Sequence, residues 1–98
     1  MSRSLVERRL SELSDRLRQL RQELAVSDEQ LRQLAEEADD ARLRSLVSET
    51  PLSEREHRDA RRHADAMLRH RGDVQSSIER LEQTQDELLD RLTAELDH

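Results

Sequence analysis

The chain has 98 residues, 41% of them charged, and a formal net charge of −6 at pH 7. It contains no Phe, Tyr, Trp or Cys, which excludes disulfides, thiol catalysis and cysteine–zinc sites and leaves little bulky material for a compact core. The negative charge disfavours nucleic acid as a partner. The lack of a long apolar run predicts no membrane contact and a cytoplasmic location.

The first half of the chain carries apolar residues at alternating steps of four and three. These steps correspond to the a and d positions of one heptad frame, interrupted by a polar residue only at Ser27. The series consists of Val6, Leu10, Leu13, Leu17, Leu20, Leu24, Leu31, Leu34, Ala38 and Ala41. Because this stretch contains neither Gly nor Pro, it predicts one long helix over about residues 3–47.

A bend over residues 48–50 separates this helix from a second one, expected over about residues 51–96. Thr50 and Pro51 are typical of an N-cap and a first helical residue. Ser53 and Glu56 form a competing capping box one turn later, so the sequence contains two start signals.

Four apolar residues beside the bend fall outside the heptad frame. Leu43, Leu46 and Val47 lie on the side of the first helix opposite to the frame, and Leu52 follows the bend. We call these four residues the tip cluster. We expect them to close the last turn of the hairpin. The alternative is an exposed apolar surface that binds a protein partner, which makes all four candidate partner-binding residues.

The second half of the chain repeats the heptad pattern, and its charges are opposite in sign to those of the segments that it faces in an antiparallel hairpin. Its frame holds Ala60, Ala64, Met67, Val74, Ile78, Leu81, Leu88 and Leu92, with His57, Arg71 and Gln85 as polar members. Pairing residue i with residue 98 − i places each a position opposite a d position. Residues 3–23 carry six Arg and four acids, whereas residues 79–98 carry two Arg and seven acids. We therefore predict an all-α fold, a long antiparallel two-helix coiled-coil hairpin that forms a single domain over residues 1–98.

One layer halfway along the hairpin is polar and weak. Ser27 is expected opposite Arg71 and next to Gly72, and a mid-helix Gly costs about 1 kcal/mol relative to Ala. This layer predicts a kink near residues 26–28 and 71–72. The alternative is that the first helix ends here, as part of a three-helix arrangement.

Additional leucines widen the apolar stripe of the second helix. Leu68, Leu89 and Leu96 occupy e positions, and Leu5 adds apolar surface at the open end of the hairpin. We expect these four residues to form a dimer face, so that two hairpins associate into a four-helix homo-oligomer. Docking on a different protein is the alternative.

The sequence offers no arrangement typical of catalysis or of cofactor or metal binding. No two of His57, His63, His70 and His98 have the i,i+3 or i,i+4 spacing of helical metal ligands. The carboxylates lack a pocket that would separate their pKa values. The integrin-type tripeptide of residues 71–73 falls inside a predicted helix. We therefore expect a non-enzymatic protein without metal or cofactor.

One segment leaves nucleic acid open as a weaker alternative. Residues 55–71 are rich in Arg and His, and such side chains contact phosphate groups. Acidic residues interleave with them and no aromatic residue is present for base stacking, which favours a solvated face paired within the chain.

The segment Leu-Ser-Glu-Arg-Glu-His-Arg-Asp-Ala-Arg-Arg (52–62) resembles the coiled-coil arm of Gre-type transcript cleavage factors. This resemblance implies a hairpin regulator whose tip enters RNA polymerase. The Gly-Asp element that precedes Leu-Ser-Glu in that family is missing, so its metal-binding role is not transferred to Glu49 or Glu54. The whole chain resembles short coiled-coil proteins of actinobacteria, which bring no known activity. The absence of Lys and Asn agrees with a GC-rich bacterial genome.

Together these observations predict a protein–protein interaction or scaffolding module that self-associates and binds a protein partner not identified by the sequence. A regulator that inserts its tip into a larger machine, such as RNA polymerase, is the first alternative, and weak nucleic-acid binding through residues 55–71 is the second.

Overall fold

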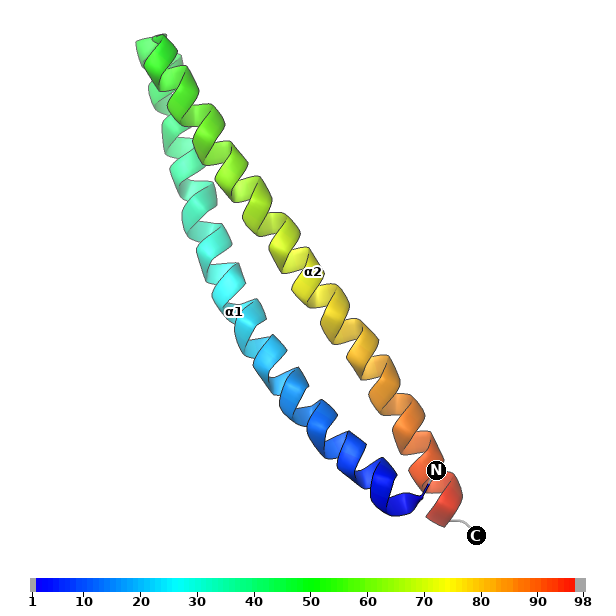
Figure 1. Cartoon of the computed structure of the whole chain (residues 1–98). Coiled ribbons are helices and arrows are strands. Elements are labelled where there is room, and N and C mark those ends of the chain that lie inside the picture. The colour runs from blue at the N-terminus through cyan, green and yellow to red at the C-terminus, as the bar shows by residue number, and fades with distance from the viewer. Residues whose placement is uncertain (1, 97–98) are drawn as a thin grey trace. The chain divides into compact units, whose positions relative to one another are not determined.

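The computed structural model describes residues 2–96 and contains two helices, α1 (Arg3–Ser48) and α2 (Pro51–Leu96). Glu49 and Thr50 connect them (Figure 1). The described residues form no strand. The prediction of an all-α helical hairpin is confirmed, and both helices begin and end close to the expected residues. Over residues 2–96, neither helix contains an apolar stretch able to cross a membrane.

The chain divides into two compact units. The terminal unit comprises Met1–Glu23 and Val74–His98, and the bend unit comprises Leu24–Asp73. In each unit, a segment of α1 lies beside a segment of α2 (Figure 1). The division falls next to the polar layer that the sequence singled out at Ser27 and Gly72.

Helix α1 is continuous through Ser27, so the alternative in which the first helix ends there, as part of a three-helix arrangement, is wrong. The small Ser27 side chain fits the frame position and is only 2% exposed. Next to it, the Asp28 carboxylate accepts a hydrogen bond from the Arg71 guanidinium of α2. A buried hydroxyl and an interhelical ion pair therefore occupy this layer while the helix continues. A kink near these residues stays a prediction.

Burial follows the heptad frame along both helices. Every frame position is buried or half-buried, at residues 6, 10, 13, 17, 20, 24, 27, 31, 34, 38, 41 and 45 of α1 and at residues 53, 57, 60, 64, 67, 71, 74, 78, 81, 85, 88, 92 and 95 of α2. Most other positions are exposed. The alternating steps of four and three thus select the one stripe on each helix that packs against the other helix.

The terminal unit has a core of large aliphatic side chains. Its buried apolar residues are Val6, Leu17, Leu20, Val74, Ile78 and Leu88, each no more than 6% exposed. Burying one such side chain contributes about 1.5–3 kcal/mol. At the edge of this core, Arg21 of α1 forms an ion pair with Glu82 of α2 at 3.5 Å.

The bend unit is packed with smaller residues. Its fully buried members are Ala41, Ser27 and Ser53, and its frame also holds half-buried alanines at positions 38, 60 and 64. Half-buried leucines at positions 24, 31 and 34 and Met67 complete the stripe. Because these layers bury less apolar surface per residue, they contribute less to stability than the core of the terminal unit.

Backbone geometry and local hydrogen bonds define the bend. Glu49 adopts a φ of 49°, the left-handed conformation that often ends a helix, and its N–H donates to the Ser45 carbonyl at 3.0 Å. Thr50 is the N-cap of α2, because its Oγ1 accepts a hydrogen bond from the Ser53 N–H at 3.1 Å. The predicted Thr50–Pro51 start is therefore the one used. Ser53 is the third residue of α2, and its Oγ accepts from the Thr50 N–H at 3.2 Å.

Candidate partner-binding tip

All four residues of the tip cluster are exposed. The exposed fractions are 61% for Leu43, 63% for Leu46, 85% for Val47 and 66% for Leu52. The expectation that these side chains close the last turn of the hairpin is therefore wrong.

Two serines explain why the tip cluster remains outside. Ser45, half-buried, and Ser53, 7% exposed, occupy the last frame positions before and after the bend. The Ser53 hydroxyl also donates to the Thr50 carbonyl at 2.9 Å. Small polar residues and their hydrogen bonds thus complete the packing at the bend, and no frame position is left there for a leucine.

Helical spacing groups three members of the tip cluster on one face. Leu43, Leu46 and Val47 are related as i, i+3 and i+4 and therefore lie next to one another on the outer face of α1. Leu52 is the second residue of α2. Both helices thus carry exposed large apolar residues close to the bend in the sequence.

An acidic group precedes this surface on the same face of α1. Glu36, Asp39 and Asp40 lie one heptad before Leu43, Leu46 and Val47, respectively, and all three are exposed. These carboxylates are not among the candidate residues predicted from the sequence. The seven-residue spacing that relates them to the apolar trio was the signal available to find them.

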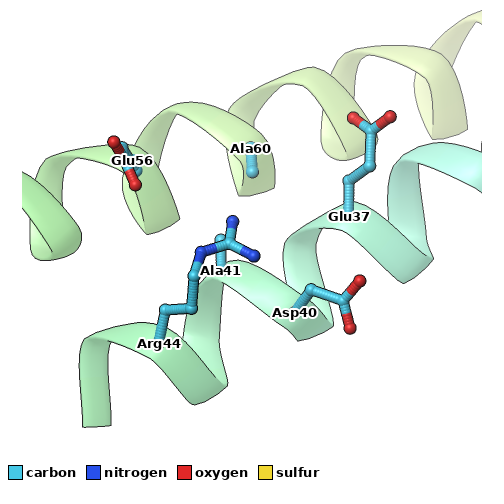
Figure 2. A pocket seen from close by; sticks show the side chains of 6 residues that line it. All are labelled: Glu37, Asp40, Ala41, Arg44, Glu56 and Ala60. Carbon is cyan, nitrogen blue, oxygen red and sulfur yellow. The ribbon is translucent and has the colours of Figure 1, made fainter. Parts of the chain in front are cut away.

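The alanine layers of the bend unit leave pockets on both sides of the helix pair. One pocket has a volume of about 250 Å³ and is lined by the six residues drawn in Figure 2, which are Glu37, Asp40, Ala41, Arg44, Glu56 and Ala60. In this view, the Arg44 side chain extends past Ala41 toward α2. A second pocket, of about 400 Å³, is lined by Ala35, Ala38, Asp39, Arg42, His57, Arg61, Ala64 and Asp65. Arg42 and Arg44 are thus directed to the flanks of α1, beside α2.

The candidate dimer face is divided between the two units. Leu68, 55% exposed, belongs to the bend unit, whereas Leu89 and Leu96, 45% and 57% exposed, belong to the terminal unit. Leu5 is half-buried in the terminal unit. Gln75 and Glu82 occupy the same row between Leu68 and Leu89. Polar residues therefore interrupt the apolar e row.

The histidines do not converge with other metal-ligating residues. His57 is half-buried in the frame, His63 and His70 are exposed, and His98 lies outside the described residues. Within residues 2–96, no group of three or more His, Cys, Asp and Glu side chains is arranged to hold a metal ion.

Two arginines of the segment 55–71 lie against acidic residues. Arg62 pairs with Asp59 at 2.7 Å within α2, and Arg71 pairs with Asp28 across the bend unit. Part of the positive charge of this segment is therefore balanced within the chain.

The tip cluster thus comprises four exposed large apolar side chains, from both helices, within residues 43–52. Comparison with known proteins adds no functional assignment, because no protein-family model, no curated protein and no solved structure matches this chain.

Proposed function

We propose that this chain is a non-enzymatic protein–protein interaction module and that the tip cluster is its docking surface. The observation that carries this proposal is the exposure of four large apolar side chains, between 61% and 85%, at one end of the bend unit. Exposed apolar groups of this kind mark binding surfaces in soluble proteins.

The packing of the bend supports a role in binding for these residues. Ser45, Ser53 and Thr50 complete the end of the hairpin without them. The tip cluster therefore makes little contribution to the fold. It exposes apolar surface to water, and a protein partner would cover that surface. A few apolar residues at the centre of an interface commonly supply most of the binding free energy.

The test is affinity capture from the native cell with three forms of the full chain. Leu46→Ser/Val47→Ser is expected to lose the captured protein. Val26→Ser is the matched control, because Val26 is also an exposed valine of α1 in the bend unit, at 56%. Helicity is measured for each form. Equal capture by all three forms would contradict a docking role for the tip.

The identity of the captured protein also decides an alternative. If RNA polymerase is captured by the native chain and lost with Leu46→Ser/Val47→Ser, the partner is the one that the Gre-type resemblance implies.

The second alternative is binding of nucleic acid through residues 55–71, which predicts an affinity that falls steeply as the salt concentration rises. Absence of binding at low salt would remove that alternative.

Self-association is a second candidate function, carried by the exposure of Leu68, Leu89 and Leu96. Exposed leucines on one helix row favour side-by-side association of two hairpins. Sedimentation equilibrium is expected to give a dimer for the native chain and a monomer for Leu89→Ser/Leu96→Ser. A native chain that is strictly monomeric and stably helical would contradict this candidate.

A further inference from the structure

We infer that the partner of the tip cluster is a basic amphipathic helix, with apolar side chains at its centre and Lys or Arg about one heptad away. This inference rests on the proposed docking function and adds the chemistry of the partner. It comes from the charges that accompany the apolar surface on α1.

The outer face of α1 carries two matched trios in succession. Leu43, Leu46 and Val47 each lie seven positions after Glu36, Asp39 and Asp40, respectively. Because the two trios share the same three helical rows, they form one surface with an acidic half and an apolar half. Their centres are about 10.5 Å apart along the helix axis, at 1.5 Å per residue.

The acidic trio is not neutralised within the described chain. Other acids of α1 are paired, as Asp28 is with Arg71 and Glu29 is with Arg32. In residues 2–96, no ion pair involves Glu36, Asp39 or Asp40.

The trio therefore has a local energetic cost. Glu36 is related to Asp39 as i,i+3 and to Asp40 as i,i+4, and like charges at these spacings destabilise a helix. Asp39 and Asp40 line the two pockets beside α2, as do Arg42 and Arg44, but within residues 2–96 no ion pair joins these acids to an arginine. The carboxylates consequently remain available to an external cation.

The charge of the bend selects among possible occupants. Residues 36–54 contain six acidic residues and two arginines, a net charge of −4, whereas residues 55–62 of α2 contain four arginines and two acidic residues. The exposed acids that share the outer rows of α1 with the apolar trio disfavour nucleic acids and anionic membranes as occupants of this face. If a second copy docked through the same surface, its acidic trio would face either the acidic or the apolar half of the first copy. Both arrangements are unfavourable, because like charges repel and a carboxylate against apolar surface loses water without gaining a partner. A helix with apolar residues at i, i+3 and i+4 and basic residues seven positions away complements both halves.

The experiment selects binders for the full chain from a displayed library of helical peptides. Each peptide has Leu at i, i+3 and i+4, and the three positions one heptad away are randomised among Lys, Gln and Glu. We expect selection to enrich Lys. The best Lys peptide should bind at least tenfold more tightly than its Glu counterpart, a preference that shrinks as salt screens the charges.

Two variants of the full chain locate the contacts. The neutralised form Glu36→Gln/Asp39→Asn/Asp40→Asn is expected to lose the preference for Lys while keeping the apolar contact. Asp86→Asn/Glu87→Gln/Asp90→Asn is the matched control, because these three exposed acids of α2 also lie in the outer rows and give the same change in net charge. The control is expected to keep the preference.

The outcomes separate this inference from the proposed function. Binders that depend on Leu46 and Val47 but show no preference for Lys would overturn the basic partner and leave the docking function standing. Failure to select any binder that depends on these two residues would overturn the helical partner, while affinity capture with Leu46→Ser/Val47→Ser decides the docking function separately. Self-association that is abolished by Leu46→Ser/Val47→Ser would make a second copy the occupant and overturn the basic partner.

Discussion

The two units of the hairpin distribute their large apolar residues in opposite ways. In the terminal unit, six apolar residues of the described chain are fully buried and two large ones, Leu89 and Leu96, are exposed. In the bend unit, Ala41 is the one fully buried apolar residue, whereas six large ones are exposed: Val26, Leu43, Leu46, Val47, Leu52 and Leu68. Both units follow the same heptad frame, so the difference lies in which residues fill it.

This contrast indicates a division of roles along one hairpin. The terminal unit uses its leucines, valines and isoleucine to bury apolar surface, which is the dominant stabilising term in folding. In the bend unit, alanine and serine occupy much of the heptad frame, and several leucines lie at exposed positions outside it. We therefore expect stability to depend mainly on the terminal unit and binding to depend mainly on the bend unit.

The largest effect is expected from removing a buried leucine of the terminal unit. Leu17 is 1% exposed, and Leu17→Ala should lower the free energy of unfolding by about 3 kcal/mol, because it removes buried apolar surface and leaves a cavity. Urea denaturation of the full chain measures this loss. Leu46→Ala, at an exposed leucine, should change stability by less than about 0.5 kcal/mol. Similar losses for the two variants would contradict the division of roles.

A smaller loss is expected at the start of α2. Thr50→Ala removes the Oγ1 that accepts the Ser53 N–H, and the loss of such an N-cap costs about 1 kcal/mol. Thr50→Ser keeps the hydroxyl and serves as the control. Thermal unfolding followed by circular dichroism measures both variants. If the alanine and serine forms melt alike, the hydrogen bond does not support the bend.

A gain of stability is expected in the middle of α2. A Cβ added at Gly72 has no atom within 4 Å, so an alanine side chain fits at this position without a clash. Replacing a mid-helix Gly by Ala should stabilise the chain by about 1 kcal/mol. A lower melting temperature for this variant would show that the backbone at position 72 needs a conformation that alanine disfavours.

The smallest effect concerns the left-handed residue of the bend. Glu49 has a φ of 49°, which glycine adopts without strain. Glu49→Gly should stabilise the chain by about 0.5 kcal/mol, because removing a left-handed cost of roughly 1–2 kcal/mol outweighs the greater backbone entropy of glycine in the unfolded chain. Glu49→Ala keeps the strain and is the matched control. Equal melting temperatures for the Gly and Ala forms would contradict this account.

The sequence predicted the fold well because the heptad signal is repeated many times along each helix. A single polar residue such as Ser27 did not outweigh that repetition, so the alternative that α1 ends there failed. The Thr50–Pro51 start was also predictable, since an N-cap followed by proline is a local signal.

The state of the tip cluster was harder to predict. Periodicity showed that Leu43, Leu46 and Val47 leave the frame, but apolar residues outside a frame can fold back over the bend or remain exposed. The outcome depends on how Ser45, Ser53 and Thr50 pack and form hydrogen bonds there, which is a matter of three-dimensional geometry. The acidic trio became informative only once the apolar trio on the same rows was known to be exposed.

The most direct test of the docking surface is site-specific photo-crosslinking in the native cell. A photo-reactive residue is placed at Val47 in one form of the full chain and at Val26 in another. The two positions share a helix and a compact unit and are both exposed. We predict one discrete crosslinked protein from position 47 and none from position 26. No product from position 47, or the same products from both positions, would contradict the docking role of the tip.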